Sequence, residues 1–402
     1  MKINHKILVC GASISGTAIA FWLEKYGYEV VVVEKSDTFR DGGQNVDIKG
    51  IGQDVIKLMG LEQQIDSRNT GEEGLRYLND KGNIISSYPK GAVGGLTSPY
   101  EILRGDLARI IYDRTKLRCD YRFGWFVVAI SELTDIVKVT FNNGSIEDFD
   151  IVVCADGIGS TTRDLVMPEY THFNYLGAYM SFFKIPKTPE DDLWAKAYQV
   201  RGGAMVFLRP GHKNDTTVLV TFLKEEFIPD WQDVSKQKNR LKEVLTAKAG
   251  LAERVVQNLD NVQDLYFGPM SQVKASQWSK GRIVLLGDAA HAPTPFTGLG
   301  TTLSLVGAYI LAGELSQNTS IKDALEQYEL IYKPHVELSQ KQISPRVIRL
   351  IHPQSKFGIM VTRMLTKIFA SALIQKLLRP RTEKQEVTGL NDFVLPNYQT
   401  IN

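Results

Sequence analysis

Apolar positions near the start of the chain follow two different periods. Residues 6–10 (KILVC) form a short apolar run, which predicts a buried parallel strand. From Ile14 to Tyr26 the apolar positions have helical spacing, and Gly27 ends the helix. Residues 29–34 (EVVVVE) form a second run that is rich in β-branched residues. The pattern predicts a strand–turn–helix–strand unit at the start of the chain.

The later pattern indicates an α/β domain that is interrupted and then completed. Helical spacing returns near residues 52–61, 105–112, 235–259 and 301–378. Strand patterns occupy residues 137–157, then 175–222 with little helix between them, and finally the stretch GRIVLL at 281–286. Strands grouped in this way predict a separate sheet inserted into the first domain.

We therefore expect three units. The α/β domain takes residues 1–72, 97–170 and 268–330, and the sheet-rich insert takes residues 73–96 and 171–267. Residues 331–402 form C-terminal helices and a tail, and the stretch after about Arg379 (RPRTEKQEVTGLND) is typical of loose structure.

Composition excludes several classes of protein. Hydrophobic residues make up 43% and charged residues 23% of 402 residues, which is ordinary for a soluble globular chain. A formal net charge of +2 gives no strong field to recruit nucleic acid, and no apolar run is long enough to span a bilayer. Cys10, Cys119 and Cys154 are scattered singly, so we expect buried thiols and no disulfide framework or metal site. We expect a cytoplasmic protein.

The turn after the first strand resembles a dinucleotide-binding loop that lacks one glycine. Gly11 and Gly16 occupy the first and third places of G-x-G-x-x-G, and Ser13 occupies the second. The Ser13 hydroxyl can cap the helix or donate to a phosphate, and the helix start at Ile14 and Ser15 supplies free N–H groups. Glu34, about 20 residues on, suits a ribose hydroxyl and disfavours a 2′-phosphate. The loop is either a plain turn with incidental glycines or a dinucleotide site. If it is a dinucleotide site, the loop leaves the choice between NAD and FAD open.

Two distant stretches bear on which nucleotide is bound. CADGIGSTTRDLV begins at Cys154 and contains Asp156 and Gly157. In RIVLLGDAAHAPTPFTGLG, Asp288 follows a predicted buried strand and can accept a ribityl hydroxyl. The loop from Pro295 to Gly298 and Gly300 opens a helix at about Thr301, whose N–H groups would stabilise a reduced flavin. Arg163 is either a site residue or a surface ion-pair partner, and His291 is expected to be structural.

Taken in order, these motifs resemble the group A flavoprotein monooxygenases. The stretches ILRGDL with Arg104 and GGQNVDI with Gln44 add to the resemblance, and Lys35 beside Glu34 completes the expected cofactor set. The resemblance implies a p-hydroxybenzoate hydroxylase-like fold, with a Rossmann-like FAD-binding α/β domain, an antiparallel substrate domain and C-terminal helices. It also implies bound FAD, NADPH as a transient electron donor, and O2. The aspartate of the DG stretch, Asp156, then assists FAD and NADPH binding, and Asp288 contacts the FAD ribityl chain.

Within this family the sequence is most similar to the tetracycline-inactivating monooxygenases. The likeness lies in EILRGDLARI, GGQNVDIKG, SKGRIVLLGDAAH and LVGAYILAGEL. It implies hydroxylation and inactivation of a polycyclic, tetracycline-like substrate through a flavin C4a-hydroperoxide, with no catalytic side chain and no metal, in a monomer. The alternatives are a tailoring hydroxylase for another aromatic polyketide or phenol, a flavin- or ligand-sequestering protein without turnover, and an NAD-dependent dehydrogenase.

Candidate substrate contacts come from the insert and from the flavin-side loop. Arg201, Met205 and Phe207 alternate and are expected to share one face of a strand, and Phe182 comes from MSFFKI. Pro295, Phe296 and Gly298 complete the set, and ordinary core packing is the alternative for the apolar members.

The C-terminal region has its own amphipathic pattern. Apolar residues from Phe357 to Leu377 recur at helical spacing, with Arg363, Lys367 and Lys376 between them. We expect residues 356–378 to cover the substrate entrance. A helix that braces two domains and a membrane-surface helix are the alternatives.

Overall fold

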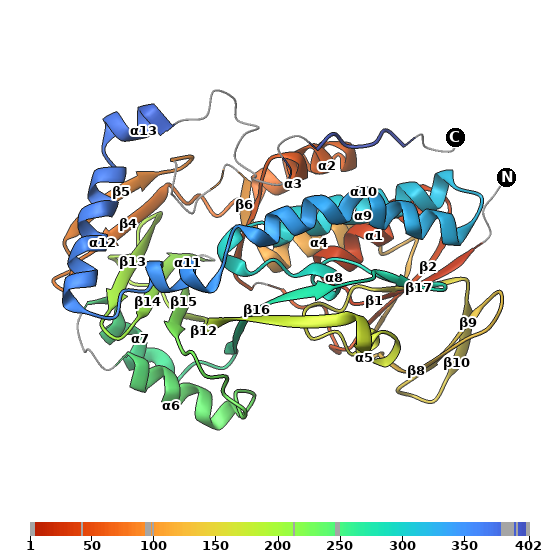
Figure 1. Ribbon diagram of the computed structural model, residues 1–402, viewed down its shortest axis with the longest axis horizontal. Coiled ribbons are helices and arrows are strands. Elements are labelled where there is room, and N and C mark those ends of the chain that lie inside the picture. The colour runs from red at the N-terminus through yellow and green to blue at the C-terminus, as the bar shows by residue number, and fades with distance from the viewer. Residues whose placement is uncertain are drawn as a thin grey trace.

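The computed structural model describes residues 5–41, 43–92, 98, 100–211, 214–245, 250–378, 390 and 393–398. They form an elongated molecule with a parallel sheet and its helices at one end and an antiparallel-rich sheet at the other (Figure 1). The expected fold class is confirmed.

The first sheet contains the strand–turn–helix–strand unit that the sequence predicts. Its order is β17-β18-β11-β1-β2-β7, and all neighbours are parallel except β17 and β18. The strands are β1 (Lys6–Cys10), β2 (Glu29–Glu34), β7 (Asp120–Phe123), β11 (Ile151–Cys154), β17 (Ser279–Lys280) and β18 (Ile283–Leu285). The apolar runs of the inner strands β18, β11, β1 and β2 are buried on both faces, as is typical of a parallel sheet.

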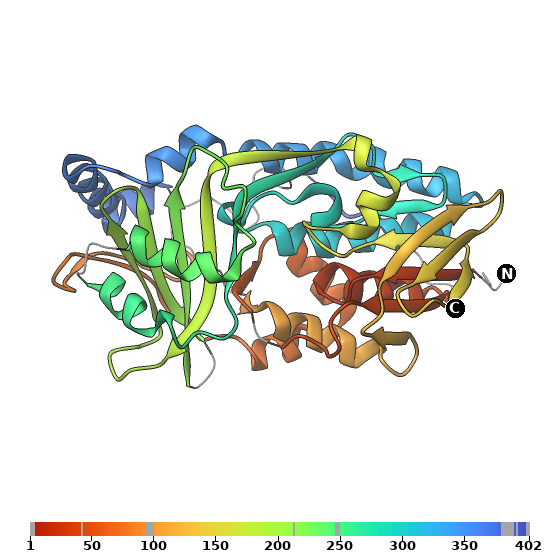
Figure 2. The ribbon, with the colours of Figure 1, turned by 90° about the horizontal axis from the view of Figure 1, so that it is seen from below.

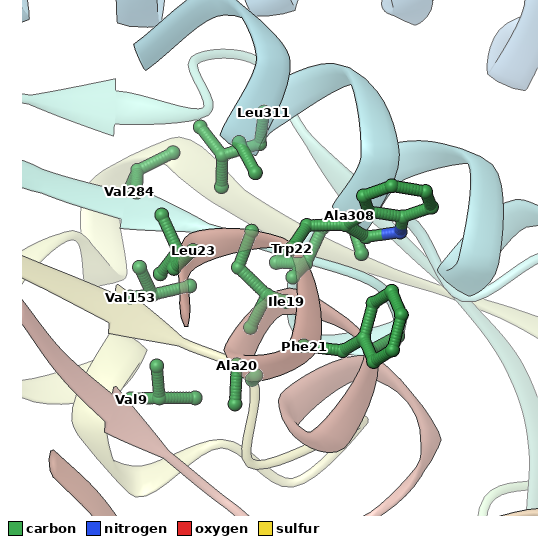
Figure 3. Packing of buried hydrophobic residues seen from close by; sticks show 14 of the residues in the cluster. Val9, Ile19, Ala20, Phe21, Trp22, Leu23, Val153, Val284, Ala308 and Leu311 are labelled. Atoms are coloured by element: carbon green, nitrogen blue, oxygen red, sulfur yellow. The ribbon is translucent and has the colours of Figure 1, made fainter. Parts of the chain in front are cut away.

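Helices α1 (Ile14–Lys25) and α9 (Gly300–Gln317) pack over this sheet. Figure 3 shows side chains of both helices meeting the strand residues Val9, Val153 and Val284. The Trp22 indole lies 4.9 Å from the Tyr309 ring, centroid to centroid. Helix α4 (Arg104–Thr115) packs beside α1, and α10 (Ile321–Lys341) packs beside α9. The N-terminal helix and a helix three hundred residues away therefore share one core.

Smaller elements complete this end of the molecule. They are the pair β3 (Asn45–Ile48) and β6 (Tyr100–Leu103), the sheet of β8 (Val127–Glu132), β9 (Val137–Phe141) and β10 (Ile146–Phe149), and the helices α2 (Ile51–Met59), α3 (Glu62–Ser67), α5 (Thr161–Val166), α8 (Asp288–His291), η1 (Pro168–Tyr170) and η2 (Pro295–Thr297).

The second large sheet has the order β16-β12-β15-β14-β13-β4-β5. Its strands are β4 (Gly74–Leu78), β5 (Ile84–Pro89), β12 (Thr171–Pro186), β13 (Trp194–Val200), β14 (Ala204–Pro210), β15 (Asp215–Leu223) and β16 (Tyr266–Ala275). Only the β4–β13 pair is parallel. The long strands β12 and β16 run from the first part of the molecule into this sheet (Figures 1 and 2). They connect the two parts through paired backbone.

The two faces of this sheet have different covers. On one face Tyr179, Val206 and Val220 pack against α6 (Val234–Val244) and α7 (Leu251–Leu259), the two helices observed where the sequence predicts one. The opposite face, called the inner face below, carries Met205 and Phe207. Helices α11 (Pro345–Ile351), α12 (Lys356–Phe369) and α13 (Ala372–Leu378) follow α10, and α12 lies beside β5 (Figure 1).

The last described residues, 393–398, follow the stretch that is expected to be loose, and they pack against the first domain. Tyr309 donates its hydroxyl to the Pro396 carbonyl at 2.8 Å, and Tyr398 donates to Glu314 at 2.6 Å. Leu390 is buried in the core of the first domain. Apart from Leu390, residues 379–392 lie outside the described residues.

Candidate active site

The motifs predicted from the sequence meet because each follows a strand of the parallel sheet. Gly11 follows β1, Glu34 ends β2, Asp156 comes shortly after β11, and Asp288 comes shortly after β18. Parallel neighbours place their carboxyl ends at one edge, and this edge is where ligands of such sheets bind. Hydrogen-bonded pairing puts these strands next to one another in the order β18-β11-β1-β2.

The two loop glycines are required by close backbone contacts. Gly11 has a φ of +103°, and a Cβ there would lie 2.7 Å from the Ala155 carbonyl oxygen. A Cβ on Gly16 would lie 1.8 Å from the Gly11 carbonyl oxygen. Gly11 also donates its N–H to the Val33 carbonyl at 2.7 Å. The β1–α1 turn therefore packs directly against the loop after β11.

Ser13 is the residue before α1, but its side chain makes no capping hydrogen bond. The capping alternative for Ser13 is therefore wrong in this structure. Helix α1 begins at Ile14, so its first N–H groups lie at the carboxyl edge, where a phosphate would meet the positive end of the helix dipole. Ser15 and Ser304 share a hydrogen bond of 2.9 Å between their hydroxyl oxygens, which connects α1 to α9.

Glu34 is held in place by backbone groups. One carboxylate oxygen accepts the Ala12 N–H and the other accepts the Ser36 N–H, both at 3.0 Å. Each oxygen keeps further lone-pair capacity for a ribose hydroxyl. Lys35 is exposed, and its ammonium lies 5.4 Å from the centre of the Phe126 ring. The end of β2 therefore carries an anchored carboxylate and an exposed ammonium group.

The loop after β11 is organised by Asp156. Its carboxylate accepts hydrogen bonds from the Ser160 hydroxyl and from the Thr162 N–H, the latter at 3.1 Å. Gly157 in this loop has a φ of +87°. Arg163 donates from Nη1 to the carbonyls of Ile158 at 3.1 Å and of Ala289 at 3.2 Å.

The Arg163 side chain is fully buried, so the alternative of a surface ion pair is wrong, although its guanidinium also bonds the neighbouring Asp164. Its two carbonyl contacts join the DG loop to α8. A single guanidinium therefore bridges the two loops.

Asp288 begins α8 and faces Arg104. Burial raises the pKa of the Asp288 carboxyl, and the positive charge of Arg104 opposes that rise. Arg104 begins α4 and is exposed, and its N–H donates to the Gln44 carbonyl at 3.0 Å. The backbone of Arg104 thus joins the GGQNVDI and ILRGDL stretches, and its charge acts on Asp288 of the GD stretch.

The loop from Pro295 to Gly300 lies between α8 and the end of β3. A Cβ on Gly300 would lie 3.8 Å from the Asp288 carboxylate. A Cβ on Gly298, whose φ is +62°, would lie 2.9 Å from the Lys49 ammonium nitrogen. Thr301 is buried in the first turn of α9, and Pro295 is exposed. Glycine at 298 therefore leaves room beside a lysine.

Thr294, just before this loop, has a φ of +93° and is the only residue other than glycine with a positive φ in the described part of the chain. Such a backbone costs about 1–3 kcal/mol and persists where the surroundings enforce it, often at functional sites.

The inner face of the second sheet presents a continuous apolar row. Phe182 pairs with Leu219, Leu219 pairs with Phe207, and Phe207 pairs with Ala197 across neighbouring strands. Met205 lies two residues from Phe207 on the same face. Leu219, Phe182 and Phe296 belong to one packed cluster, so the loop from Pro295 to Gly300 reaches this face.

Residues 4–339 match the model of the FAD binding domain family, and the chain belongs to that family. A flavin-dependent monooxygenase from an unknown prokaryotic organism is 36% identical over 346 residues, covering 85% of this chain and 89% of its own. The FAD-dependent monooxygenase asL6 of Sarocladium schorii is 33% identical and covers 98% of each chain. The protein is an FAD-dependent monooxygenase.

Solved structures agree with this assignment. The crystal structure of tetracycline destructase Tet(51) is 29% identical to this monooxygenase and superposes with a TM-score of 0.83. The superposition covers 98% of this chain and all of that one. The resemblance to group A flavin monooxygenases is therefore confirmed.

One part of the sequence-based site, the position of Arg201, differs from the structure. Arg201 is exposed in the turn before β14 and does not share a strand face with Met205 and Phe207, so that prediction is wrong. The reason is that Gly202 and Gly203, both with positive φ, end the strand pattern at the turn. Arg201 therefore lies in the turn between β13 and β14, near Asp80 and Tyr198.

Sequence reasoning missed Asp47 and Lys49 of this monooxygenase. Asp47 accepts the Ser98 N–H at 3.1 Å, and the Lys49 N–H donates to the Thr302 hydroxyl oxygen at 2.9 Å. Both side chains lie beside Gly298. The available signal was an acid and a base two residues apart in NVDIKG.

A buried ion-pair network between the two parts of the molecule was also missed. Arg209 of β14 pairs with Glu72 at 2.9 Å and with Glu101 of β6. Glu101 also accepts from Asn45 at 2.7 Å and from Thr70 at 2.6 Å. Burial raises the pKa of Glu101, and Arg209 opposes the rise. The network couples the second large sheet to the β3–β6 pair, which lies beside the Pro295–Gly300 loop.

Other chemistry is limited. Among the described residues no group of three or more His, Cys, Asp or Glu side chains is placed to hold a metal ion. Cys10, Cys119 and Cys154 are free and buried, and burial raises the pKa of each thiol. Within the described ranges no helix is long and apolar enough to cross a membrane.

Proposed function

We propose that this FAD-dependent monooxygenase hydroxylates and inactivates tetracycline-type antibiotics, with NADPH as electron donor and O2 as co-substrate. The observation that carries the proposal is the likeness to tetracycline destructase Tet(51), which extends over 98% of the chain. Bound FAD, once reduced, would supply the electrons that activate O2. The protein's own task is to bind, orient and exclude water.

We propose that the carboxyl edge holds FAD as follows. The N–H groups at the start of α1, after Gly11 and Ser13, bind the pyrophosphate, and Glu34 binds the adenosine ribose. Asp288 and Arg104 bind the ribityl chain and adjoining phosphate region. The N-terminus of α9, at Gly300 and Thr301, faces the electron-rich edge of the flavin ring and stabilises negative charge there.

The donor set fits a flavin nucleotide. It combines a helix N-terminus, an anchored acid at the end of β2 and a second acid, Asp288, opposed by a cation, Arg104. Lys49 and Asp47, beside Gly298, are further candidates for the ring edge. Gln44, Lys35, Asp156 and Gly157 stay predictions. Lys35 is exposed, and the Asp156 carboxylate is engaged within its own loop.

We propose that the apolar row on the inner face contacts the substrate. Phe182, Phe207 and Met205 form its floor, and Phe296 brings the flavin-side loop to the same cluster. An apolar wall of this kind keeps water from a reactive oxygen species and suits a polycyclic ring system. Arg201, in the turn between β13 and β14, stays a prediction as a substrate contact.

We propose that α12 covers the part of this inner face that lies beside Gln199 and Met205. Thr362 accepts a hydrogen bond of 3.0 Å from Gln199, which is in register with Met205. Tyr88 of β5 donates its hydroxyl to the Thr366 carbonyl at 2.7 Å. Deleting the chain from Gln354 onward should change substrate affinity or flavin retention, and unchanged steady-state kinetics would contradict this role.

A second candidate is a hydroxylase for another aromatic polyketide or phenol. The relatives from the unknown prokaryote and from Sarocladium schorii are named only as monooxygenases. They cover 85% and 98% of this chain, and the destructase covers 98%. Both candidates need the same FAD site, so only substrate assays separate them.

The deciding experiment uses the purified protein. Its visible spectrum reports bound flavin, and NADPH oxidation and the tetracycline absorbance band are then followed with and without oxygen, with NADH in parallel. Tetracycline-dependent and oxygen-dependent loss of both signals supports the proposal. A yellow protein without a tetracycline-dependent change keeps the fold and rejects the substrate. Tetracycline binding without NADPH consumption supports a sequestering protein.

Phe182→Ala should raise the KM for tetracycline more than it lowers flavin content. Monomeric state and cytoplasmic location stay predictions.

A further inference from the structure

Helices α12 and α13 expose a large apolar surface. Large hydrophobic residues there are between 40% and 80% exposed, and we call them the α12–α13 apolar face: Phe357, Met360, Met364, Leu365, Ile368, Phe369, Leu373 and Leu377. Single exposed apolar residues are common, but a contiguous patch marks a surface that binds something. Figure 1 shows both helices at the end of the molecule away from the parallel sheet.

The opposite side of α12 already provides the packing that the helix needs. Ile359 is buried, and Arg363 forms an ion pair of 2.8 Å with Asp80. Thr362 and the Thr366 carbonyl make the contacts with Gln199 and Tyr88 described above. Because these anchors hold the helix on the sheet, the α12–α13 apolar face is turned outward and is not part of the core.

The charge pattern around this face is one-sided. Between Glu337 and Glu383 the sequence contains no aspartate or glutamate. Its described basic residues are Lys341, Arg346, Arg349, Lys356, Arg363, Lys367 and Lys376. The nearby acids Asp80 and Glu225 are engaged, with Arg363 and with Arg349 respectively. Lys356, Lys367 and Lys376 are exposed and lie on the two helices themselves, with no ion-pair partner in the part of the chain that the structure describes.

We propose that the α12–α13 apolar face docks the enzyme onto an anionic lipid surface, with the helices lying in the plane of the interface. An amphipathic helix with aromatic and aliphatic residues on one face and lysines beside them is the structure that binds such surfaces. A second copy of the chain fits worse, because a two-fold contact would bring the same lysines together without a carboxylate to pair them. The inference does not depend on which substrate the enzyme oxidises.

The electrostatic part should be large enough to measure. Each basic residue near an anionic membrane strengthens binding by about fivefold, and salt screens the effect. Reversing two lysines to glutamate should therefore weaken partitioning by a factor of about 100 or more. The apolar part should not depend on salt.

The test is co-sedimentation of the FAD-loaded enzyme with lipid vesicles. We expect binding to vesicles of phosphatidylglycerol mixed with phosphatidylcholine at low salt, at least tenfold weaker binding at about 0.5 M salt, and little binding to pure phosphatidylcholine. The variants K367E/K376E and L373Q/L377Q should both lose binding and keep their flavin. Leu373 and Leu377 are each 80% exposed, so these changes spare the core.

Matched controls alter equally exposed residues elsewhere. Leu117→Gln changes a leucine that is 92% exposed, and Lys322→Glu changes a lysine whose side chain is 79% exposed at the start of α10. Both should bind vesicles as the unaltered enzyme does. Absence of binding to anionic vesicles, equal binding to neutral ones, or unchanged binding of the two double variants would overturn the proposal. So would a dimer in size-exclusion chromatography that L373Q/L377Q abolishes.

Discussion

His291 makes a sharp prediction about acid stability. It ends α8, is almost fully buried, and lies 4.9 Å from the Trp278 ring, centroid to centroid. Neither ring nitrogen has a hydrogen-bond partner in the described structure. Burial therefore lowers the pKa of the imidazole from 6.5 to about 4. The folded protein holds this histidine neutral where the unfolded chain would protonate it.

The direction and size of the pH effect on the free energy of unfolding follow from the difference in protons bound by the folded and unfolded chains. Between pH 6.5 and about 4 the unfolded chain binds one proton more than the folded protein, so the free energy of unfolding falls as the pH falls. Over the whole interval the loss is about 3 kcal/mol, because one pKa unit corresponds to about 1.4 kcal/mol. Between about pH 7.5 and about pH 5 this single group should cost about 2 kcal/mol.

His291→Phe removes the titrating group and keeps an aromatic ring against Trp278. Urea unfolding of the two proteins, saturated with FAD and followed by circular dichroism, gives the free energy of unfolding at each pH. The advantage of the variant over the unaltered enzyme should grow by about 2 kcal/mol from about pH 7.5 to about pH 5. His172→Gln, which removes an exposed histidine of β12, is the control for losing any histidine. An advantage of His291→Phe that is constant with pH would refute the reasoning.

Three further predictions concern the cofactor edge and the network between the two parts. Gly11→Ala should cost about 2–4 kcal/mol of stability and reduce FAD content, because its Cβ would meet the Ala155 carbonyl at 2.7 Å. The control is Gly27→Ala, at a glycine with a φ of +88° and open space around it. This control should cost only about 1–2 kcal/mol in thermal unfolding. Arg209→Met removes the cation from between two buried carboxylates, Glu72 and Glu101, and should lower the free energy of unfolding by about 3–5 kcal/mol, whereas a loss below about 1 kcal/mol would show that the pairing is dispensable. Asp288→Ala should lower the ratio of flavin to protein absorbance after gel filtration, and full flavin occupancy would contradict its proposed role.

The fold was largely predictable because its signals are local. The apolar strand 6–10, the helix from Ile14 and the β-branched run 29–34 have periods that only one kind of structure satisfies in each case. The motifs around Gly11, Asp156 and Asp288 each follow a predicted strand, so their convergence at one edge follows from parallel pairing. The predicted fold class and the FAD-dependent monooxygenase family are confirmed.

Arg201 shows where local patterns fail. Alternation placed it on a strand face with Met205 and Phe207, but two glycines with positive φ form a turn there and place it between β13 and β14. Arg163 was left open between two roles, because burial under a loop depends on neighbours that lie far away in the sequence. The tail at 393–398 is likewise packed by contacts with α9, which no local pattern of its own predicts.

The sequence by itself determined the strand–turn–helix unit, the order of the cofactor motifs and the division into a parallel and an antiparallel-rich part, since these depend on periodicity and on glycine chemistry. Only the tertiary structure decided that Asp47 and Lys49 lie beside Gly298, that Arg209 joins Glu72 to Glu101, and that the apolar side of α12 faces outward. Those features depend on which distant elements come into contact. The periodicity of one sequence shows which side of a helix or strand is apolar, but it does not show which element packs against that side.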